Sequence, residues 1–308
     1  MNMSEKENMK EYITTPVSEG EENPTTETKK ISEYTGQGGQ KGNFYGDALN
    51  DSNINDIVED TLPHVVVLVG FARYGKSTFV SSFYHAVMRT GKIGKYKFLD
   101  SDTLLGFERR AHIRREEIKV GKRLDRTPMY ADFFLSLLFE NTETKKKVKL
   151  ILSDRSGEDY RDYGKFEAKI NDDKSLRYAR HIIFFLDAAA TASDDYLDMQ
   201  SDLGMLLPRM SKYGAFNSQK CVDVVFNKKD LVTKVYEADY LTNRSEIVSK
   251  IKEATPVNRV VDLKSLQIPM NDECNQFFEY LLDSCEQPEK LNDECMEQQD
   301  WVSRLLKV

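Results

Sequence analysis

A glycine-rich loop between an apolar run and a helical segment constrains the fold of this chain more than any other feature. Residues 65–69 read VVVLV, which is typical of a buried parallel strand. Residues 70–77 continue as GFARYGKS and match the pattern G-x-x-x-x-G-K-[ST]. The residues that follow predict a helix with one apolar face that ends at Gly91. This order of strand, loop and helix is the context that a phosphate-binding P-loop requires.

The residue types within this loop suit phosphate binding. Gly70 and Gly75 allow a tight turn that brings backbone N–H groups onto phosphate oxygens, and the helix N-terminus adds partial positive charge. Lys76 can reach the β- and γ-phosphates, and the Ser77 hydroxyl can ligate Mg²⁺. We therefore predict that the nucleotide is contacted by Gly70, Ala72, Arg73, Tyr74, Gly75, Lys76, Ser77 and Thr78.

Composition limits the class of protein. The chain has 308 residues, of which 40% are hydrophobic and 31% charged, so we expect a globular core. Its four cysteines lack metal-type spacing and indicate a reducing compartment. We find neither a signal peptide nor an apolar run near 18 residues, which predicts a cytoplasmic protein that does not span a membrane.

Charge and polarity divide the chain into three parts. Residues 1–60 carry a net charge of −8 and are polar, which predicts a disordered acidic N-terminal tail. Residues 61–285 are expected to form the P-loop domain. Residues 286–308 carry −3 and form a C-terminal tail in which Trp301 and nearby leucines predict a short amphipathic helix.

Strand and helix signals alternate through the domain, which predicts an α/β fold with a mostly parallel sheet. We expect further strands at residues 133–139, 148–152, 181–186, 221–226 and 259–263. The expected helices cover residues 159–177, 193–212, 243–254 and 271–285. Ser193 is the predicted N-cap of the second of these helices, and Leu197 is expected on its inward face.

A second motif follows the strand at residues 148–152. Residues 154–157 read DRSG and match D-x-x-G. Asp154 can hold Mg²⁺ through water, and the Gly157 N–H can contact a γ-phosphate. We therefore predict a metal site that includes Ser77 and Asp154.

A third motif follows the strand at residues 221–226. Residues 227–230 read NKKD and match N-K-x-D. The Asp230 carboxylate can accept hydrogen bonds from guanine N1–H and the 2-amino group, two donors that adenine lacks. All three motifs fall at carboxyl ends of strands, where such sheets bind ligands. We therefore predict a guanine site formed by Asn227, Lys228 and Asp230.

The motifs GFARYGKS, DRSG and NKKD together resemble GTPases of the translation-factor and Ras-like class over residues 62–285. The resemblance implies a three-layer P-loop GTPase fold with a six-stranded sheet, mostly parallel with one antiparallel edge strand. It also implies GTP/GDP and Mg²⁺ as ligands and hydrolysis to GDP and phosphate. A switch threonine that ligates the metal is expected before the second strand. Thr127 has that position within an extended switch I insert at residues 92–130, and Thr103 is the alternative.

More narrowly, the chain is similar to the "double-GTPase" families of prokaryotic conflict systems. The residues that carry this similarity are SDTLLGFE at 101–108, Arg126-Thr127-Pro128, and GED at 157–159. The similarity implies a bacterial cytosol, a role in defence, and a protein partner that is a second GTPase.

Two residues bear on catalysis. Ras-like enzymes carry a water-orienting Gln directly after D-x-x-G, whereas this chain carries Glu158, whose charge repels a γ-phosphate. Arg73 lies within the loop as G-x-x-R-x-G-K-S, which resembles guanylate-binding proteins and atlastins, where such an arginine acts as an internal finger when two domains meet. The candidate catalytic residues are thus Arg73, Lys76, Gly157 and Glu158.

Two hypotheses for the function stay open at this point. The first is a GTP-hydrolysing molecular switch, which Arg73 favours; the second is a GTP-dependent scaffold or assembly protein with negligible turnover, which Glu158 favours. A basic run at residues 109–126 could bind nucleic acid, but it contains acids and few aromatic residues. A solvated helix face, or a contact with the chain's own acidic tails, explains that run better.

Overall fold

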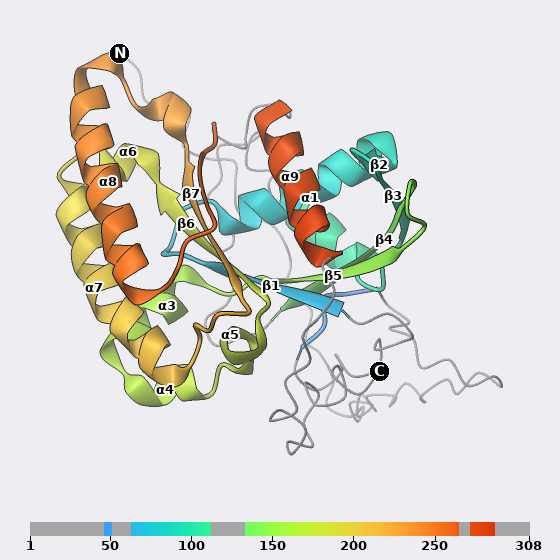
Figure 1. Cartoon of the computed structure of the whole chain (residues 1–308), viewed down its shortest axis with the longest axis horizontal. Helices are drawn as coiled ribbons and strands as arrows, with labels where there is room; N and C mark the ends of the chain where they lie inside the picture. The colour runs from blue at the N-terminus through green and yellow to red at the C-terminus, as the bar shows by residue number, and fades with distance from the viewer. Residues whose placement is uncertain (1–45, 51–62, 112–132, 265–271, 287–308) are drawn as a thin grey trace, which may run out of the picture. The chain divides into compact units, whose positions relative to one another are not determined.

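A mixed β-sheet lies between two layers of helices in the computed structural model (Figure 1). The structure describes residues 46–50, 63–111, 133–264 and 272–286. The strands in this part of the chain are β1 (Pro63–Val69), β2 (Lys92–Ile93), β3 (Tyr96–Asp100), β4 (Phe134–Asn141), β5 (Lys147–Ser153), β6 (His181–Asp187), β7 (Cys221–Asn227) and β8 (Arg259–Asp262).

These strands form one sheet in the order β2-β3-β4-β5-β1-β6-β7-β8. Strands β5, β1, β6, β7 and β8 are parallel to one another, whereas β4, β3 and β2 pair in antiparallel fashion at one edge. The predicted α/β fold, mostly parallel with an antiparallel edge, is confirmed. The sheet has two more strands than the six expected, because β2 and β3 extend the edge from within the stretch assigned to the insert. Most side chains of β3 are at least partly exposed, so its hydrophobic pattern is weak.

The helices are α1 (Lys76–Thr90), α3 (Gly157–Lys165), α4 (Glu167–Asn171), α5 (Lys174–Tyr178), α6 (Ala188–Thr191), α7 (Asp195–Tyr213), α8 (Glu237–Ala254) and α9 (Asp272–Cys285). Residues 104–111 are also helical, and residues 229–231 and 234–236 form 3₁₀ turns, η2 and η3. None of the described helices is long and apolar enough to cross a membrane.

Each face of the sheet buries its own hydrophobic core. Helices α1 and α9 cover one face, where Phe79 packs edge-on against Phe185 of β6 and Phe278 of α9, with ring centroids 4.9 and 5.2 Å apart. Helices α3, α7 and α8 cover the other face (Figure 1). Because both faces are covered, the parallel strands are apolar almost throughout, as the run at residues 65–69 predicted.

Three local predictions were wrong. Residues 159–177 form parts of three short helices, because Phe166 adopts an extended backbone and Asp173 starts a new helix by accepting from the Leu176 N–H. Ser193 does not cap α7, which begins after Asp194; its hydroxyl donates to the Ala190 carbonyl of the preceding turn. Leu197 is 66% exposed, since the buried face of α7 runs through Tyr196, Met199, Leu203, Leu206 and Met210.

Residues 46–50 pack against the antiparallel edge, although they fall within the stretch assigned to the acidic tail. Leu49 exchanges two backbone hydrogen bonds with Phe134 of β4, at 2.9 and 2.8 Å, and its side chain is buried. The folded part of the chain therefore includes residues before the predicted domain start at residue 61.

We expect Leu49→Ala to lower the free energy of unfolding by about 2–4 kcal/mol, because it removes a buried side chain and leaves a cavity. Urea denaturation of the full chain measures this loss. Leu197→Ala is the matched control, since Leu197 is mostly exposed and its truncation should cost little. Equal effects of the two substitutions would contradict the packing of residues 46–50 described here.

Candidate nucleotide-binding site

The three sequence motifs meet at one edge of the sheet. Gly70 follows β1, Asp154 follows β5, and Asn227 is the last residue of β7. Because β1, β5 and β7 belong to the parallel part of the sheet, their carboxyl ends lie on the same side. This is the edge where open α/β sheets bind ligands.

Gly75 sets the geometry of the loop. It adopts a left-handed conformation with φ 100° and ψ 14° and is the N-cap of α1. The Asn227 Nδ2 amide donates to the Tyr74 carbonyl at 3.1 Å, and a Cβ on Gly75 would overlap that amide. A glycine N-cap offers no side-chain oxygen to the first turn, and no acidic residue lies in that turn. The loop therefore presents the positive end of α1 to an anion.

Lys76 folds back over the loop. Its ammonium group donates to the carbonyl oxygens of Gly70, at 2.5 Å, and Phe71, at 3.3 Å, and it lies 5.6 Å from the centre of the Tyr160 ring. Burial lowers the pKa of Lys76 to about 8, although Asp154 acts in the opposite direction. A phosphate group would add negative charge next to this buried amine and favour its protonated form.

The predicted metal residues Ser77 and Asp154 lie in contact. The Ser77 hydroxyl donates to Asp154 Oδ1 at 3.1 Å, and Asp154 is almost fully buried. A hydroxyl and a carboxylate are oxygen donors of the kind Mg²⁺ prefers, and Mg²⁺ at phosphate sites needs only one or two protein ligands. The donor set therefore fits Mg²⁺, although the described residues contain no group of three or more His, Cys, Asp or Glu that could hold a metal.

The D-x-x-G turn touches the phosphate loop through its backbone. A Cβ on Gly157 would overlap the Ala72 amide nitrogen and the Phe71 carbonyl carbon. Ser156 caps α3 through its hydroxyl, which accepts from the Glu158 N–H at 3.3 Å and donates to the Glu158 carboxylate at 2.6 Å. The Glu158 carboxylate thus has a local hydrogen-bond partner.

Buried ion pairs of Arg155 stabilise the D-x-x-G turn. It is buried and forms ion pairs with two fully buried acids, Asp159 at 3.6 Å and Asp173 at 3.2 Å. Asp173 also accepts from the Tyr163 hydroxyl at 3.0 Å. The sequence analysis missed this arginine, because the middle residues of D-x-x-G carry no motif constraint.

The N-K-K-D segment supports the loop from the other side. Lys228 adopts a left-handed backbone with φ 64°, and its ammonium group donates to the Arg73 carbonyl at 2.8 Å and to Asp187 Oδ2 at 2.5 Å. Asp230 is exposed. Asp187, the acidic partner of Lys228, was not among the predicted site residues. Its position at the carboxyl end of a parallel strand, β6, could have indicated a place in the site.

The loop after β8 lies beside this segment, because the Lys229 N–H donates to the Leu263 carbonyl at 3.0 Å. Lys264 follows Leu263 directly, so the loop after β8 begins next to N-K-K-D. Ser265 lies outside the described residues.

Arg73 has an exposed side chain and a left-handed backbone with φ 69°. Within the part of the chain that the structure describes, its guanidinium forms neither a hydrogen bond nor an ion pair. Thr127 lies outside the described residues. Thr103, the alternative switch threonine, is buried, and its hydroxyl accepts from the Ser136 N–H at 2.8 Å, so it ties the chain to β4.

The described start of the basic run contacts acids of the same chain. Arg109 pairs with Asp47, and Arg110 pairs with Asp154 of the metal site. Asp47 belongs to the stretch assigned to the acidic N-terminal tail, whereas Asp154 lies within the domain, so only the contact of Arg109 is of the expected kind. Arg110 was not among the predicted site residues, because nothing in its local sequence distinguishes it from its neighbours.

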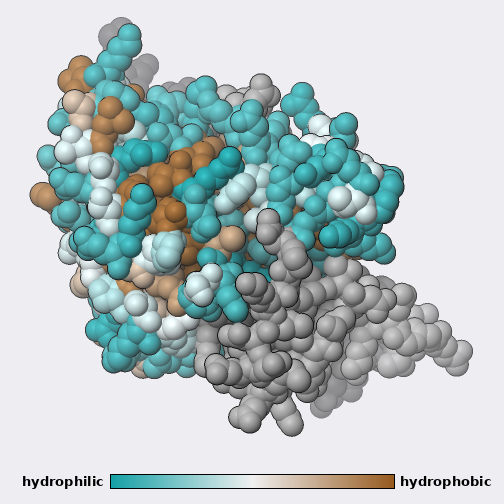
Figure 2. All heavy atoms as spheres, viewed as in Figure 1, coloured by the Kyte–Doolittle hydropathy of each residue, from teal (hydrophilic) through white to brown (hydrophobic). Residues whose placement is uncertain are grey.

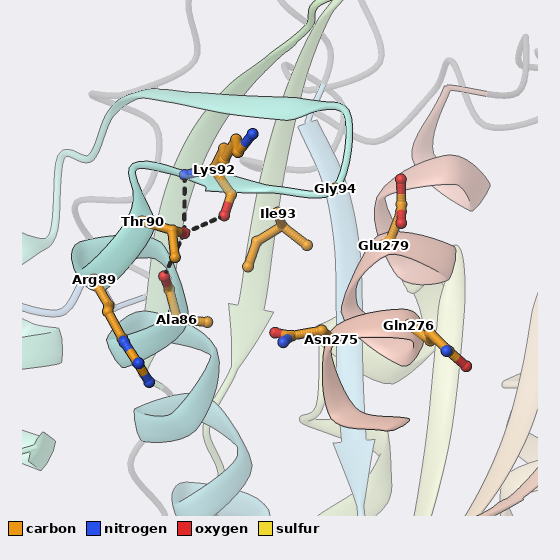
Figure 3. A pocket seen from close by; sticks show the side chains of 9 residues that line it. All are labelled: Ala86, Arg89, Thr90, Lys92, Ile93, Gly94, Asn275, Gln276 and Glu279. Carbon is orange, nitrogen blue, oxygen red and sulfur yellow. Dashed lines mark hydrogen bonds between the residues drawn. The ribbon is translucent and has the colours of Figure 1, made fainter. Parts of the chain in front are cut away.

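A pocket of about 600 Å³ lies away from this site, between the C-terminal end of α1, β2 and α9 (Figure 3). By the rise of a helix, its lining residue Thr90 is roughly 20 Å from Lys76. The Thr90 hydroxyl donates to the carbonyl oxygens of Ala86 and Lys92. The Glu279 carboxylate on α9 accepts a hydrogen bond from the Lys95 N–H at 3.2 Å. None of the predicted site residues lines this pocket.

Exposed hydrophobic side chains gather near the N-K-K-D segment. Leu231 of η2 is 56% exposed, Val235 of η3 is 80% exposed, and Leu241 near the start of α8 is 54% exposed. Figure 2 shows hydrophobic colour at the end of the molecule where α8 begins. The segment that follows N-K-K-D thus exposes several hydrophobic side chains.

Comparison with known families identifies the domain. The sequence profile of the family described as Double-GTPase 2 matches residues 64–276, well over half of the chain. The chain belongs to the Double-GTPase 2 family. The match includes all three motifs, and it confirms the resemblance to double-GTPases inferred from the sequence. Comparison with curated protein sequences gives no significant match.

Solved structures that resemble this Double-GTPase 2 chain include translation factors and a Roco protein. A bacterial selenocysteine-specific elongation factor EF-Sec has 14% identity and a TM-score of 0.36, over 73% of this chain and 28% of its own. SelB from Methanococcus maripaludis, with the GTP analogue GPPNHP, has 11% identity and a TM-score of 0.39, over 76% and 36%. The Methanosarcina barkeri Roco2 RocCORdC protein bound to GDP has 13% identity and a TM-score of 0.39, over 78% and 55%. The match thus spans less than two thirds of the length of each.

We expect Gly157→Ala to weaken guanine-nucleotide binding by at least about tenfold, because the added methyl group pushes the D-x-x-G turn off the phosphate loop. Isothermal titration with GDP in the presence of Mg²⁺ measures this change. Gly204→Ala within α7 is the control, since a Cβ there meets only the flexible end of the Lys250 side chain from α8. Unchanged affinity of Gly157→Ala would show that the contact between the two segments does not shape the site.

Proposed function

We propose that this protein binds GTP with Mg²⁺ and hydrolyses it to GDP and phosphate, acting as a molecular switch. The observation that carries the proposal is the convergence of GFARYGKS, DRSG and NKKD at one sheet edge, with side-chain contacts between them. Asp154 contacts Ser77, Asn227 contacts Tyr74, and Lys228 contacts Arg73. Membership of the Double-GTPase 2 family supports the same activity.

Each side chain has a defined part in the proposed reaction. Lys76 and the N–H groups at the start of α1 bind the phosphates, and Asn227 and Lys228 hold the loop in shape. Bound Mg²⁺ supplies positive charge that stabilises the transferring phosphoryl group. Ser77 and Asp154 would hold that ion, and Thr127 would join them in the GTP state. Gly157 would donate its N–H to the γ-phosphate.

Guanine selectivity tests the proposal. Asp230→Asn should weaken GTP binding and improve xanthosine triphosphate binding, because the exchanged amide donates where the xanthine edge accepts. Competition between the two nucleotides for the wild-type and variant proteins measures this exchange. Asp239→Asn, on the first turn of α8, is a control for the loss of one nearby charge. Equal affinity of the wild type for ATP and GTP would refute the guanine site.

A second candidate is a GTP-dependent scaffold with negligible turnover. The observation that favours it is the Glu158 carboxylate, which stands where a water-orienting Gln is expected and accepts from the Ser156 hydroxyl at 2.6 Å. A carboxylate held on its own helix cap does not orient an attacking water. Turnover then requires charge stabilisation from another residue, for which Arg73 is the candidate.

Arg73→Ala separates the two candidates. It should leave GTP affinity within about tenfold, since Lys76 and the backbone still hold the phosphates, but lower hydrolysis by at least ~10²-fold if Arg73 acts in the transition state. Arg73→Lys should not restore the rate, because the fork of donors is lost. Phosphate release at saturating GTP measures the rate, and Arg89→Ala at the far end of α1 is the control. Wild-type turnover by Arg73→Ala would favour the scaffold or a finger supplied by a partner.

The partner belongs to the same proposal. A switch needs a protein that distinguishes its two states, and the family name leads us to propose a second GTPase, including a nucleotide-dependent dimer of this chain. GTP turnover that rises more than linearly with protein concentration would support the dimer. Strictly linear turnover would argue for a different partner.

A further inference from the structure

Asp154 is engaged on both carboxylate oxygens by the chain itself. Its side chain is 1% exposed. Oδ1 accepts from the Ser77 hydroxyl at 3.1 Å, and Oδ2 accepts from Arg110 Nε at 2.6 Å. A buried carboxylate needs a cation or several donors, and Arg110 supplies the cation here.

Arg110 is held in this place by further contacts. Its Nη1 donates to the Gly106 carbonyl at 3.0 Å, its guanidinium lies 5.1 Å from the centre of the Phe133 ring, and its side chain is 15% exposed. The neighbouring Arg109 differs in exposure and in partner, since its side chain is 59% exposed and pairs with Asp47. Arg110 is thus a largely buried residue that is held at the site by several contacts, unlike the solvated Arg109.

We propose that Arg110 is a positioning residue that competes with Mg²⁺ for Asp154 and so sets the Mg²⁺ concentration at which the site retains guanine nucleotide. The inference rests on the proposed function. In P-loop sites the corresponding aspartate helps to hold the metal ion, so the Asp154 carboxylate would help Ser77 to hold Mg²⁺ here. A guanidinium on the same carboxylate repels a dication and already compensates the negative charge that would attract it.

The exchange keeps Asp154 neutralised in both states. Without metal, Arg110 compensates the buried charge; with Mg²⁺ and nucleotide, the ion does so and Arg110 withdraws from Oδ2. Arg110 therefore stabilises the metal-free protein and opposes metal binding. Because it extends from helical residues 104–111, its release also links occupancy of the site to that helix.

Arg110→Gln tests this role through retention of a fluorescent GDP analogue at a series of free Mg²⁺ concentrations. We expect half-maximal retention at a roughly tenfold lower Mg²⁺ concentration than in the wild type, because one charge-assisted hydrogen bond no longer has to be broken. Arg109→Gln is the matched control and should stay within about twofold of wild type. In EDTA, Arg110→Gln should unfold at a lower temperature than Arg109→Gln, and Mg²⁺ with GDP should raise its midpoint by more.

The outcomes separate the inference from the proposed function. Absence of Mg²⁺-dependent GDP retention by the wild type would overturn both. Retention by the wild type, with Arg110→Gln unshifted or shifted to higher Mg²⁺, would overturn the inference alone. If Arg110→Gln does not fold, Arg110→Lys is tested instead, since it keeps a cation but loses the contact through Nε. A smaller shift of half-maximal retention to lower Mg²⁺ supports the inference, and the absence of any shift refutes it.

Discussion

Three close backbone approaches hold the phosphate loop, and each requires a glycine. Gly70 lies against the carbonyl of Phe185 on β6, Gly75 against the amide of Asn227, and Gly157 against the backbone of Phe71 and Ala72. A Cβ at any of the three would overlap a neighbouring backbone or amide atom. The loop is therefore fixed by its own glycines together with the segments that approach it, which are β6, the end of β7 and the D-x-x-G turn after β5.

This dependence explains how much the sequence could predict. Gly70, Gly75 and Gly157 are motif positions, so the loop and its place at the sheet edge could be predicted from the sequence, whereas the hydrogen bond from Asn227 to the Tyr74 carbonyl was not. The predictions for Ser193 and Leu197 were wrong, because α7 begins after Asp194 and Leu197 lies on its exposed face, next to the buried Tyr196. The extra strands β2 and β3 were missed since a short, exposed edge strand shows little alternation of polar and apolar residues.

Long-range ion pairs are the other class that sequence reasoning missed. Arg110 meets Asp154 across 44 positions, Asp187 meets Lys228 across 41, and Arg155 meets Asp173 across 18. No local pattern encodes such pairs, because a charged residue in a loop is usually solvated. They become visible only when the fold buries one partner, and each of the three involves or adjoins a motif residue.

These pairs share a consequence for how the site responds to a ligand. Lys76 donates to loop carbonyls, Arg110 pairs with Asp154, and Lys228 pairs with Asp187, so each of these three cations already has an acceptor from the chain. A triphosphate must compete with those acceptors for the cations, and a metal ion must compete with Arg110 for Asp154, so the net effect of either ligand on stability is smaller than its gross attraction to the site. Arg73 differs, since its guanidinium has no such contact within the described residues. Of these four cations, it is therefore the one that can reach a phosphate without first breaking a contact with another described residue.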